Sequence, residues 1–167
     1  MTAARQQRKR RALGAVVRVL ALALLVFAIV SKGAYATTER IVVDRHTGLA
    51  IAGYDPVAFY TDRKPILGDS DLEYSYGGAV WRFANIGNRE AFAARPDVYM
   101  PQFGGYDPLG VAHGVALAGS PLLWLIAGGR LFLFYDNKRL QAFTADQEHI
   151  TGAADRKWPD VARTLSN

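Results

Sequence analysis

Residues 101–114 read PQFGGYDPLGVAHG and lie between two hydrophobic segments. The stretch holds four of the chain's 16 glycines, two of its prolines and one of its three histidines. Adjacent glycines permit positive φ angles or a close backbone approach, and the prolines prevent a helix from running through. We therefore expect a loop of fixed shape, the kind of segment on which binding sites tend to lie.

A second distinctive run lies upstream, where residues 53–60 read GYDPVAFY. Asp55 can cap a helical turn that begins at Pro56, because an aspartate before a proline at the first helical position is a typical start. That turn would direct the apolar side chains that follow toward the interior or an adjoining groove. A short strand over residues 40–43 and a turn over residues 44–48 precede it.

Two glycine pairs predict two hairpins. The first pair follows the alternating segment 72–76 and precedes its partner, residues 79–84. The second pair separates residues 122–127 from residues 130–135. Pairing outward from the second turn puts Leu125 opposite Phe132 and Trp124 opposite Leu133. Both faces of this hairpin are apolar, so we expect it to be the covered centre of one sheet.

Helices are expected around the hairpins. One is predicted from Asn88 to Ala94, and another from a cap at Asp136 to Phe143. Residues 144–147 read TADQ, the pattern of a capping box, and would start a last helix that Pro159 closes. Within it, apolar residues at helical spacing would pack on the sheet: Ile150, Ala153, Ala154 and Trp158. The predicted fold class is α+β, a small antiparallel sheet with packed helices.

Length and charge limit the function classes. The 167 residues suffice for one domain with a core, half of them are hydrophobic and 21% are charged. Residues 1–36 carry seven basic and no acidic side chains, which leaves 13 basic against 15 acidic in the remainder. The basic excess is therefore confined to the N-terminal segment, and nucleic-acid binding is disfavoured. No internal repeat is apparent in the sequence.

The N-terminal 36 residues have the order of a secretory signal. A basic stretch is followed by an apolar run over residues 19–30 and by Ala34-Tyr35-Ala36, an A-x-A cleavage site. We expect cleavage after Ala36 and a single domain over residues 37–167. The alternative is an uncleaved anchor over residues 12–30, which would tether the domain to the inner membrane. Both place the domain outside the cytoplasm.

The chain has no cysteine. An exported domain without disulfides must be held by packing alone. Thiol redox chemistry and the soft ligands that Cu(I) prefers are also excluded.

Residues 53–60 and 101–112 resemble the Gly-Tyr-Asp-Pro-Val-Ala-Tyr-Phe and Pro-Gln-Tyr-Gly-Gly-Tyr-Cys-Ala-x-Gly-Val-Ala runs of exported YHS domain proteins. Residues 83–92 are similar to the Phe-Cys-Ser-x-x-Cys-Lys-x-x-Phe segment of metal-type YHS modules. The cysteine positions of these patterns hold Ala84, Asn88 and Asp107. The resemblance implies a YHS-like fold in the periplasm or on the inner membrane facing it, without the family's sulfur ligands.

Ligand contacts are expected from the two resembling runs, namely Tyr54, Asp55, Phe103, Gly104, Gly105 and Tyr106. As an alternative, Asp107 and His113 could supply oxygen and nitrogen ligands to a divalent metal of the copper or zinc type, with His46 or His149 as a distant third. The favoured interpretation of this pair is structural, with the histidine bonding a backbone carbonyl and the aspartate ordering the turn. His46 and His149 are expected in solvent.

Aromatic residues could line a pocket, although such stripes are more often core: Tyr54, Tyr60, Tyr99, Tyr106 and Trp81. No Gly-x-Ser-x-Gly, His-Glu-x-x-His or phosphate-loop motif is present, and the carboxylates are not paired. The sequence therefore favours a non-catalytic binding module of the cell envelope for a small ligand or an envelope protein. The alternative is a metal-handling periplasmic protein that uses His113 and Asp107.

Overall fold

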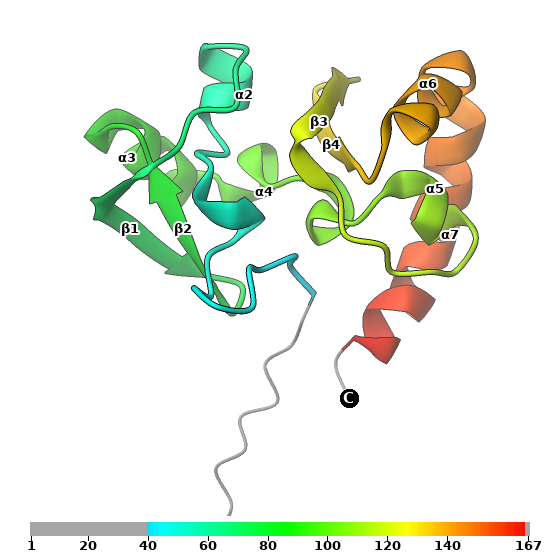
Figure 1. Cartoon of the computed structure of the whole chain (residues 1–167), viewed down its shortest axis with the longest axis horizontal. Coiled ribbons are helices and arrows are strands. Elements are labelled where there is room, and N and C mark those ends of the chain that lie inside the picture. The colour runs from blue at the N-terminus through cyan, green and yellow to red at the C-terminus, as the bar shows by residue number, and fades with distance from the viewer. Residues whose placement is uncertain (1–39, 166–167) are drawn as a thin grey trace, which may run out of the picture. The chain divides into compact units, whose positions relative to one another are not determined.

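The computed structural model describes residues 40–165, which belong to a unit formed by Thr37–Asn167 (Figure 1). The predicted signal or anchor over residues 1–36 lies outside the described residues. Within residues 40–165, none of the helices combines the length and the apolar character that crossing a membrane requires.

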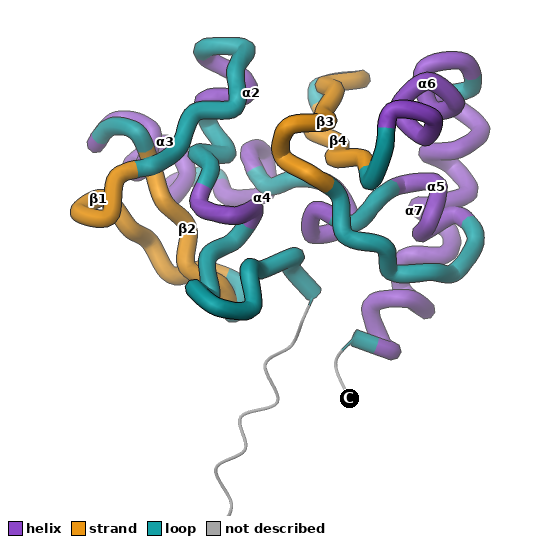
Figure 2. Tube along the Cα trace, viewed as in Figure 1, coloured by secondary structure: helices purple, strands orange, loops and turns teal. Residues whose placement is uncertain are grey.

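Two antiparallel hairpins and a set of helices make up the described unit (Figures 1 and 2). The elements are, in chain order, η1 (Ile51–Gly53), α2 (Ala58–Thr61), β1 (Asp69–Tyr76), β2 (Ala79–Phe83), α3 (Ile86–Ala94), α4 (Pro96–Tyr99), η2 (Gln102–Gly105), α5 (Pro108–Ala112), β3 (Ser120–Ala127), β4 (Arg130–Phe134), α6 (Asn137–Ala145) and α7 (Gln147–Thr164). The α+β class is confirmed. The prediction of a single sheet is wrong, because each hairpin forms a separate two-stranded sheet.

The predicted pairing of the second hairpin is confirmed, with Trp124 opposite Leu133 and Leu125 opposite Phe132. Its expected place at the covered centre of a sheet is wrong. Strand β4 is buried from its second residue onward, whereas β3 is only half-buried and exposes Leu122. Because the two hairpins do not pair with each other, β3 keeps an unpaired edge within the described unit.

The last helices differ from the prediction at two points. The Thr144 hydroxyl donates to the Leu140 carbonyl at 2.8 Å inside α6, so it does not start a capping box, and Asp146 is the N-cap of α7. Pro159 lies inside α7 and does not end it. Ala154 and Val161 are buried on either side of Pro159, and this packing offsets the hydrogen bond that a proline removes from a helix.

Two hydrophobic clusters form the core. The first contains Phe59, Trp81, Phe83 and Phe92, and the Trp81 and Phe92 rings lie 5.0 Å apart. The second centres on the rings that β4 and α6 contribute, such as Phe132 and Phe143 at 4.8 Å, with Phe134 and Val111 beside them. Each hairpin thus packs its inner aromatic residues on the helix that follows it.

The chain contains an internal repeat, contrary to the interpretation of the sequence. The order of 3-10 turn, short helix, hairpin and helix occurs first as η1, α2, β1–β2 and α3, and again as η2, α5, β3–β4 and α6. Tyr54 forms an isolated bridge with Leu67, and Tyr106 forms the same bridge with Ala118. The two halves share few side chains outside the Gly-Tyr-Asp-Pro runs, which is why the sequence alone does not reveal them.

The repeat extends to irregular details of the hairpins. The register shift in β1 falls between Asp69 and Glu73, and the shift in β3 falls between Ser120 and Trp124. These positions are 51 residues apart in both cases. The irregularity of each hairpin therefore falls at the equivalent position of the repeat.

The expected strand over residues 40–43 is absent from the described unit, because its backbone groups bond singly to both halves. The Val42 N–H donates to the Gly104 carbonyl at 2.8 Å, and the Val42 carbonyl accepts from the Ile51 N–H at 3.1 Å. A Cβ on Gly104 would lie 1.8 Å from the Arg40 carbonyl oxygen. The glycine of the central loop is therefore needed for this crossing.

Candidate functional site

Asp55 holds the first half together from a fully buried position. One carboxylate oxygen accepts from the Val57 N–H at 2.8 Å and from the Ala58 N–H at 3.3 Å, so Asp55 caps the predicted turn at Pro56, whereas α2 itself begins at Ala58 with Val57 as its N-cap. The other accepts from the Ala84 N–H at 2.8 Å and from the Asn88 amide at 2.6 Å. Asp55 thus ties α2, the end of β2 and α3 together, and its oxygens are used within the fold.

Asp107 does the same in the second half and is also fully buried. One oxygen accepts from the Gly110 N–H at 2.8 Å and from Arg139 Nη1 at 3.0 Å, and the other accepts from the Tyr135 N–H at 3.0 Å. Arg139 stands at the helical position that Asn88 has in the first half. The buried carboxylate of the second half therefore has a charged partner.

The other predicted ligand contacts lie mostly inside the fold. Phe103, Gly105 and Tyr106 are buried, while Tyr54 and Gly104 are half-buried. Their role as ligand contacts remains a prediction. The distinctive runs of the sequence have an observed role in shaping each half.

The residues of the metal alternative do not come together. Asp107 uses both oxygens in the contacts above, whereas His113 is exposed and its Nδ1 lies 2.6 Å from the Leu109 carbonyl oxygen. This is the geometry of the favoured structural interpretation. His46 and His149 are exposed. Among residues 40–165, no group of three or more histidine, aspartate and glutamate side chains is placed to hold a metal ion.

The aromatic residues expected to line one pocket divide between the two core clusters. Trp81, Tyr54, Tyr60 and Tyr99 belong to the first, and the Tyr60 and Tyr99 rings meet edge to face at 5.6 Å. Tyr106 belongs to the second. They do not form a common pocket in the described unit.

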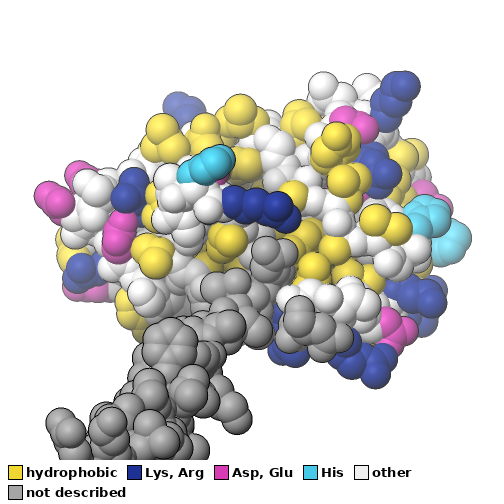
Figure 3. Space-filling view, turned by 60° about the horizontal axis from the view of Figure 1, so that its bottom comes forward, with side chains coloured by type: hydrophobic (Ala, Val, Ile, Leu, Met, Phe, Trp, Pro, Cys, Tyr) yellow, Lys and Arg dark blue, Asp and Glu magenta, His cyan; other side chains and the backbone are white. Residues whose placement is uncertain are grey.

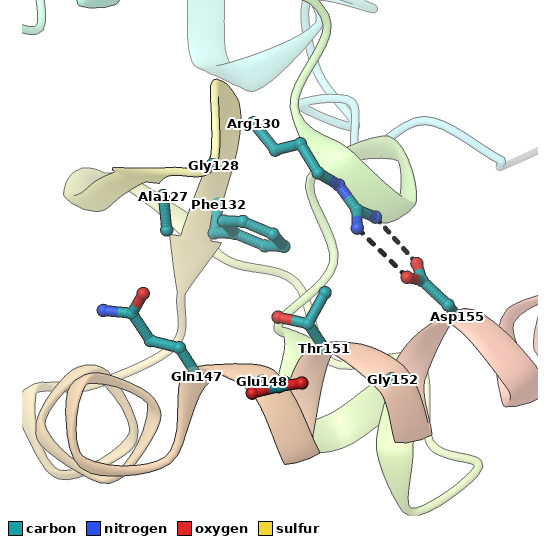
Figure 4. Close-up of a pocket in the computed structure, with 9 residues that line it drawn as sticks. All are labelled: Ala127, Gly128, Arg130, Phe132, Gln147, Glu148, Thr151, Gly152 and Asp155. Carbon is teal, nitrogen blue, oxygen red and sulfur yellow. Dashed lines mark hydrogen bonds and ion pairs between the residues drawn. The ribbon is translucent and has the colours of Figure 1, made fainter.

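A groove that the sequence did not indicate lies between the tip of the second hairpin and α7 (Figure 4). Its volume is about 400 Å³, within the range of small-ligand sites. We call it the Arg130 groove. The hairpin contributes Ala127, Gly128, Arg130 and Phe132, and α7 contributes Gln147, Glu148, Thr151, Gly152 and Asp155.

Arg130 is held on several sides. Its two terminal nitrogens donate to the two oxygens of Asp155 at 3.0 and 2.7 Å, as Figure 4 shows, and Nε donates to Gln102 at 2.9 Å. The guanidinium carbon lies 5.9 Å from the centre of the Phe103 ring and 5.3 Å from that of the Phe132 ring. The bonds to Asp155 raise the pKa of Arg130, so this wall of the groove is a fixed, neutralised ion pair.

Charges outside the groove are mixed. On the face shown in Figure 3, lysine and arginine side chains lie in several separate places, with acidic and hydrophobic side chains between them. That face has no continuous basic surface. The charges that line the groove therefore matter more for ligand choice than a field from that face.

Sequence reasoning missed Arg130, Glu148 and Asp155 because they are separated in the chain and belong to no motif. One signal was present. Gly152 interrupts an otherwise helical pattern, and such a glycine often marks a place where space beside the helix is needed. In the structure Gly152 lines the groove.

Comparison with protein-family models, with curated proteins and with solved structures finds no match to this chain.

Proposed function

We propose that the chain is a non-catalytic, YHS-like binding module of the cell envelope that takes a small organic ligand in the Arg130 groove. The observation that carries the proposal is the groove itself. It combines apolar lining residues, the half-buried Ala127 and the almost fully buried Phe132, with a few polar groups, the usual composition of a small-molecule site.

The chemistry of the groove favours binding over catalysis. Asp155 is occupied by Arg130, which leaves Glu148 as the carboxylate available to a ligand. Acid–base catalysis usually needs a positioned pair of titratable groups, whereas a single carboxylate beside an apolar surface suits recognition.

The location follows from the N-terminal segment and from the resemblance to exported YHS domain proteins. We propose that residues 1–36 direct the domain to the periplasm, either as a removed signal or as an anchor in the inner membrane. An envelope protein is the partner class that this location implies. Intact-mass measurement of the chain recovered from a bacterial envelope fraction distinguishes a start at Thr37 from a start at Met1, and a cytoplasmic chain of full mass would contradict export.

Binding is tested by a ligand-observed NMR screen of small organic compounds with the full chain. Gly152→Leu places a side chain in the groove, and leucine is a good helix former. We expect compounds that bind the native chain to lose binding in this variant. Lys157→Leu, at an exposed position of α7 outside the groove, is the matched control. Equal binding to the native chain and to folded Gly152→Leu would contradict the groove as the site.

A further inference from the structure

We infer that the ligand of the Arg130 groove is an organic cation, an ammonium group carried on an apolar body. The inference rests on the proposed function, since it names the ligand class of the same groove. It follows from the charges that line the groove and from a comparison between the two halves of the chain.

The lining charges leave a negative excess. Glu148 and Asp155 contribute two carboxylates, and Arg130 contributes one positive charge that its bonds to Asp155 neutralise. Among the described residues, the ion pairs are formed by other side chains, and Glu148 is in none of them. Its exposed carboxylate lies in the first turn of α7, where the helix N-terminus offsets part of its charge, and it is the lining carboxylate without a side-chain counter-ion.

Arg156 is a second basic side chain close to a residue that lines the groove. Its Nη1 would lie 3.4 Å from a Cβ on Gly152, but the side chain is exposed and does not line the groove. Its positive charge weakens the negative potential at the rim of the Arg130 groove, although the side chain does not line the groove. Its removal should therefore strengthen the binding of a cation.

The floor of the groove suits the apolar body of such a ligand. Ala127 is half-buried and offers apolar surface, Phe132 lines the groove with only 1% of its surface exposed, and Gly152 leaves room beside them. A ligand with an aromatic or aliphatic body would bury apolar area there while its ammonium group lies at Glu148.

An equivalent hollow of about 350 Å³ lies at the tip of the first hairpin, where Trp158 of α7 and residues 102–104 of η2 also line it; we call it the Trp158 hollow. Tyr76, Gly77, Asp97, Met100 and Pro101 line it, each 51 residues before Ala127, Gly128, Glu148, Thr151 and Gly152 of the Arg130 groove. Both sites thus carry a carboxylate at the same position of the repeat.

The charge at that position is compensated only in the first half. The Asp97 carboxylate lies 3.8 Å from Arg95 Nε, and Arg40 also lines the hollow. At the equivalent position, Glu148 makes no ion pair, and the arginine that lines the groove with it, Arg130, is paired with Asp155. Asp97 is therefore a natural control for Glu148, with the same place in the repeat and a different electrostatic setting.

The test uses three probes that share one phenylethyl body, namely phenethylammonium, 2-phenylethanol and 3-phenylpropanoate. Each is titrated into the isotopically labelled full chain, and amide shifts of Gly128, Thr151 and Gly152 report the groove. We expect phenethylammonium to bind about tenfold more tightly than 3-phenylpropanoate, with the alcohol between them. Added salt should reduce the difference.

Variants locate the charge effect. Glu148→Gln should weaken phenethylammonium binding by about two- to fivefold, Arg156→Gln should strengthen it by a smaller factor, and Asp97→Asn should leave it unchanged. Equal affinities for the three probes would overturn the cation inference and leave groove binding intact. Failure of all three to shift the groove amides would count against both. An Asp97→Asn effect equal to that of Glu148→Gln would also overturn the inference.

Discussion

Asp55 and Asp107 hold the same place in the two halves of the chain. Each is fully buried, and each carboxylate accepts from the backbone of the turn that follows it, from the end of the second strand of its hairpin and from a side chain of the next helix. The aspartate of each Gly-Tyr-Asp-Pro run therefore joins the elements of its half through buried hydrogen bonds.

Replacing Asp55 should destabilise the domain. In Asp55→Asn the new NH2 group would face donors that the carboxylate now accepts, so a buried hydrogen bond is lost without compensation. We expect the free energy of unfolding to fall by about 2–3 kcal/mol, as measured by urea denaturation. Asp69→Asn, at an exposed position, is the control. A change below about 0.5 kcal/mol in the free energy of unfolding of Asp55→Asn would contradict the stabilising role of the Asp55 carboxylate.

The equivalent substitution Asp107→Asn should lower the free energy of unfolding by at least as much as Asp55→Asn, because Arg139 loses its charged partner. A second replacement, Arg139→Gln, should recover part of that loss, because it removes the positive charge that Asp107→Asn leaves without a partner. The comparison is made as a double-mutant cycle of unfolding free energies. Strict additivity of the two changes would show that the two side chains do not interact.

Two repeated glycines provide a test of the duplication. A Cβ on Gly68 would lie 2.4 Å from the Arg82 carbonyl carbon, and one on Gly119 would lie 2.6 Å from Leu133 Cβ. Neither neighbour is the end of a flexible side chain, so the backbone of each hairpin must shift. We expect Gly68→Ala and Gly119→Ala each to lower the free energy of unfolding by about 1–3 kcal/mol. A loss at one position alone would indicate that the halves do not share this packing.

How much the sequence predicts depends on the range of the interaction. The pairing of Trp124 with Leu133 was predicted from the glycine pair between the two apolar segments. The cap by Asp55 was predicted from the residues next to it in the chain. Both predictions rest on local signals. The repeat remained hidden because its copies share backbone geometry more than side chains. The groove formed by Arg130 and Asp155 depends on a contact across 25 residues that no local pattern encodes. Pro159 was misjudged because packing on both sides of it outweighs helix propensity.

Gly152→Ala should have the opposite effect from the hairpin glycines. Gly152 is inside α7 with an ordinary φ, and the nearest atom to a new Cβ is the flexible end of Arg156 at 3.4 Å. Alanine lowers the entropy of the unfolded chain, so we expect a gain of about 0.5–1 kcal/mol in the free energy of unfolding. Thermal and urea unfolding measure it. A loss of stability would mean that the groove wall does not tolerate even a methyl group.

Tyr60 offers a test of a buried hydroxyl. Its oxygen is buried and makes no hydrogen bond within the described part of the chain. Burial raises the pKa of Tyr60, and the nearby backbone N–H of Leu131 offsets part of that rise. Above the ordinary value of 10.0 the unfolded chain ionises Tyr60 while the folded chain keeps it protonated, so stability falls as the pH rises through this range.

Tyr60→Phe should therefore act in two ways. At neutral pH the free energy of unfolding should stay constant or rise by up to about 1 kcal/mol, because the buried hydroxyl lacks a partner. Above pH 10 the variant should lose less stability than the native chain, as urea unfolding at several pH values would show. Tyr135→Phe, at an exposed position, controls for the removal of a tyrosine. A loss of more than about 1 kcal/mol at neutral pH in Tyr60→Phe alone would show that the hydroxyl is hydrogen-bonded in solution.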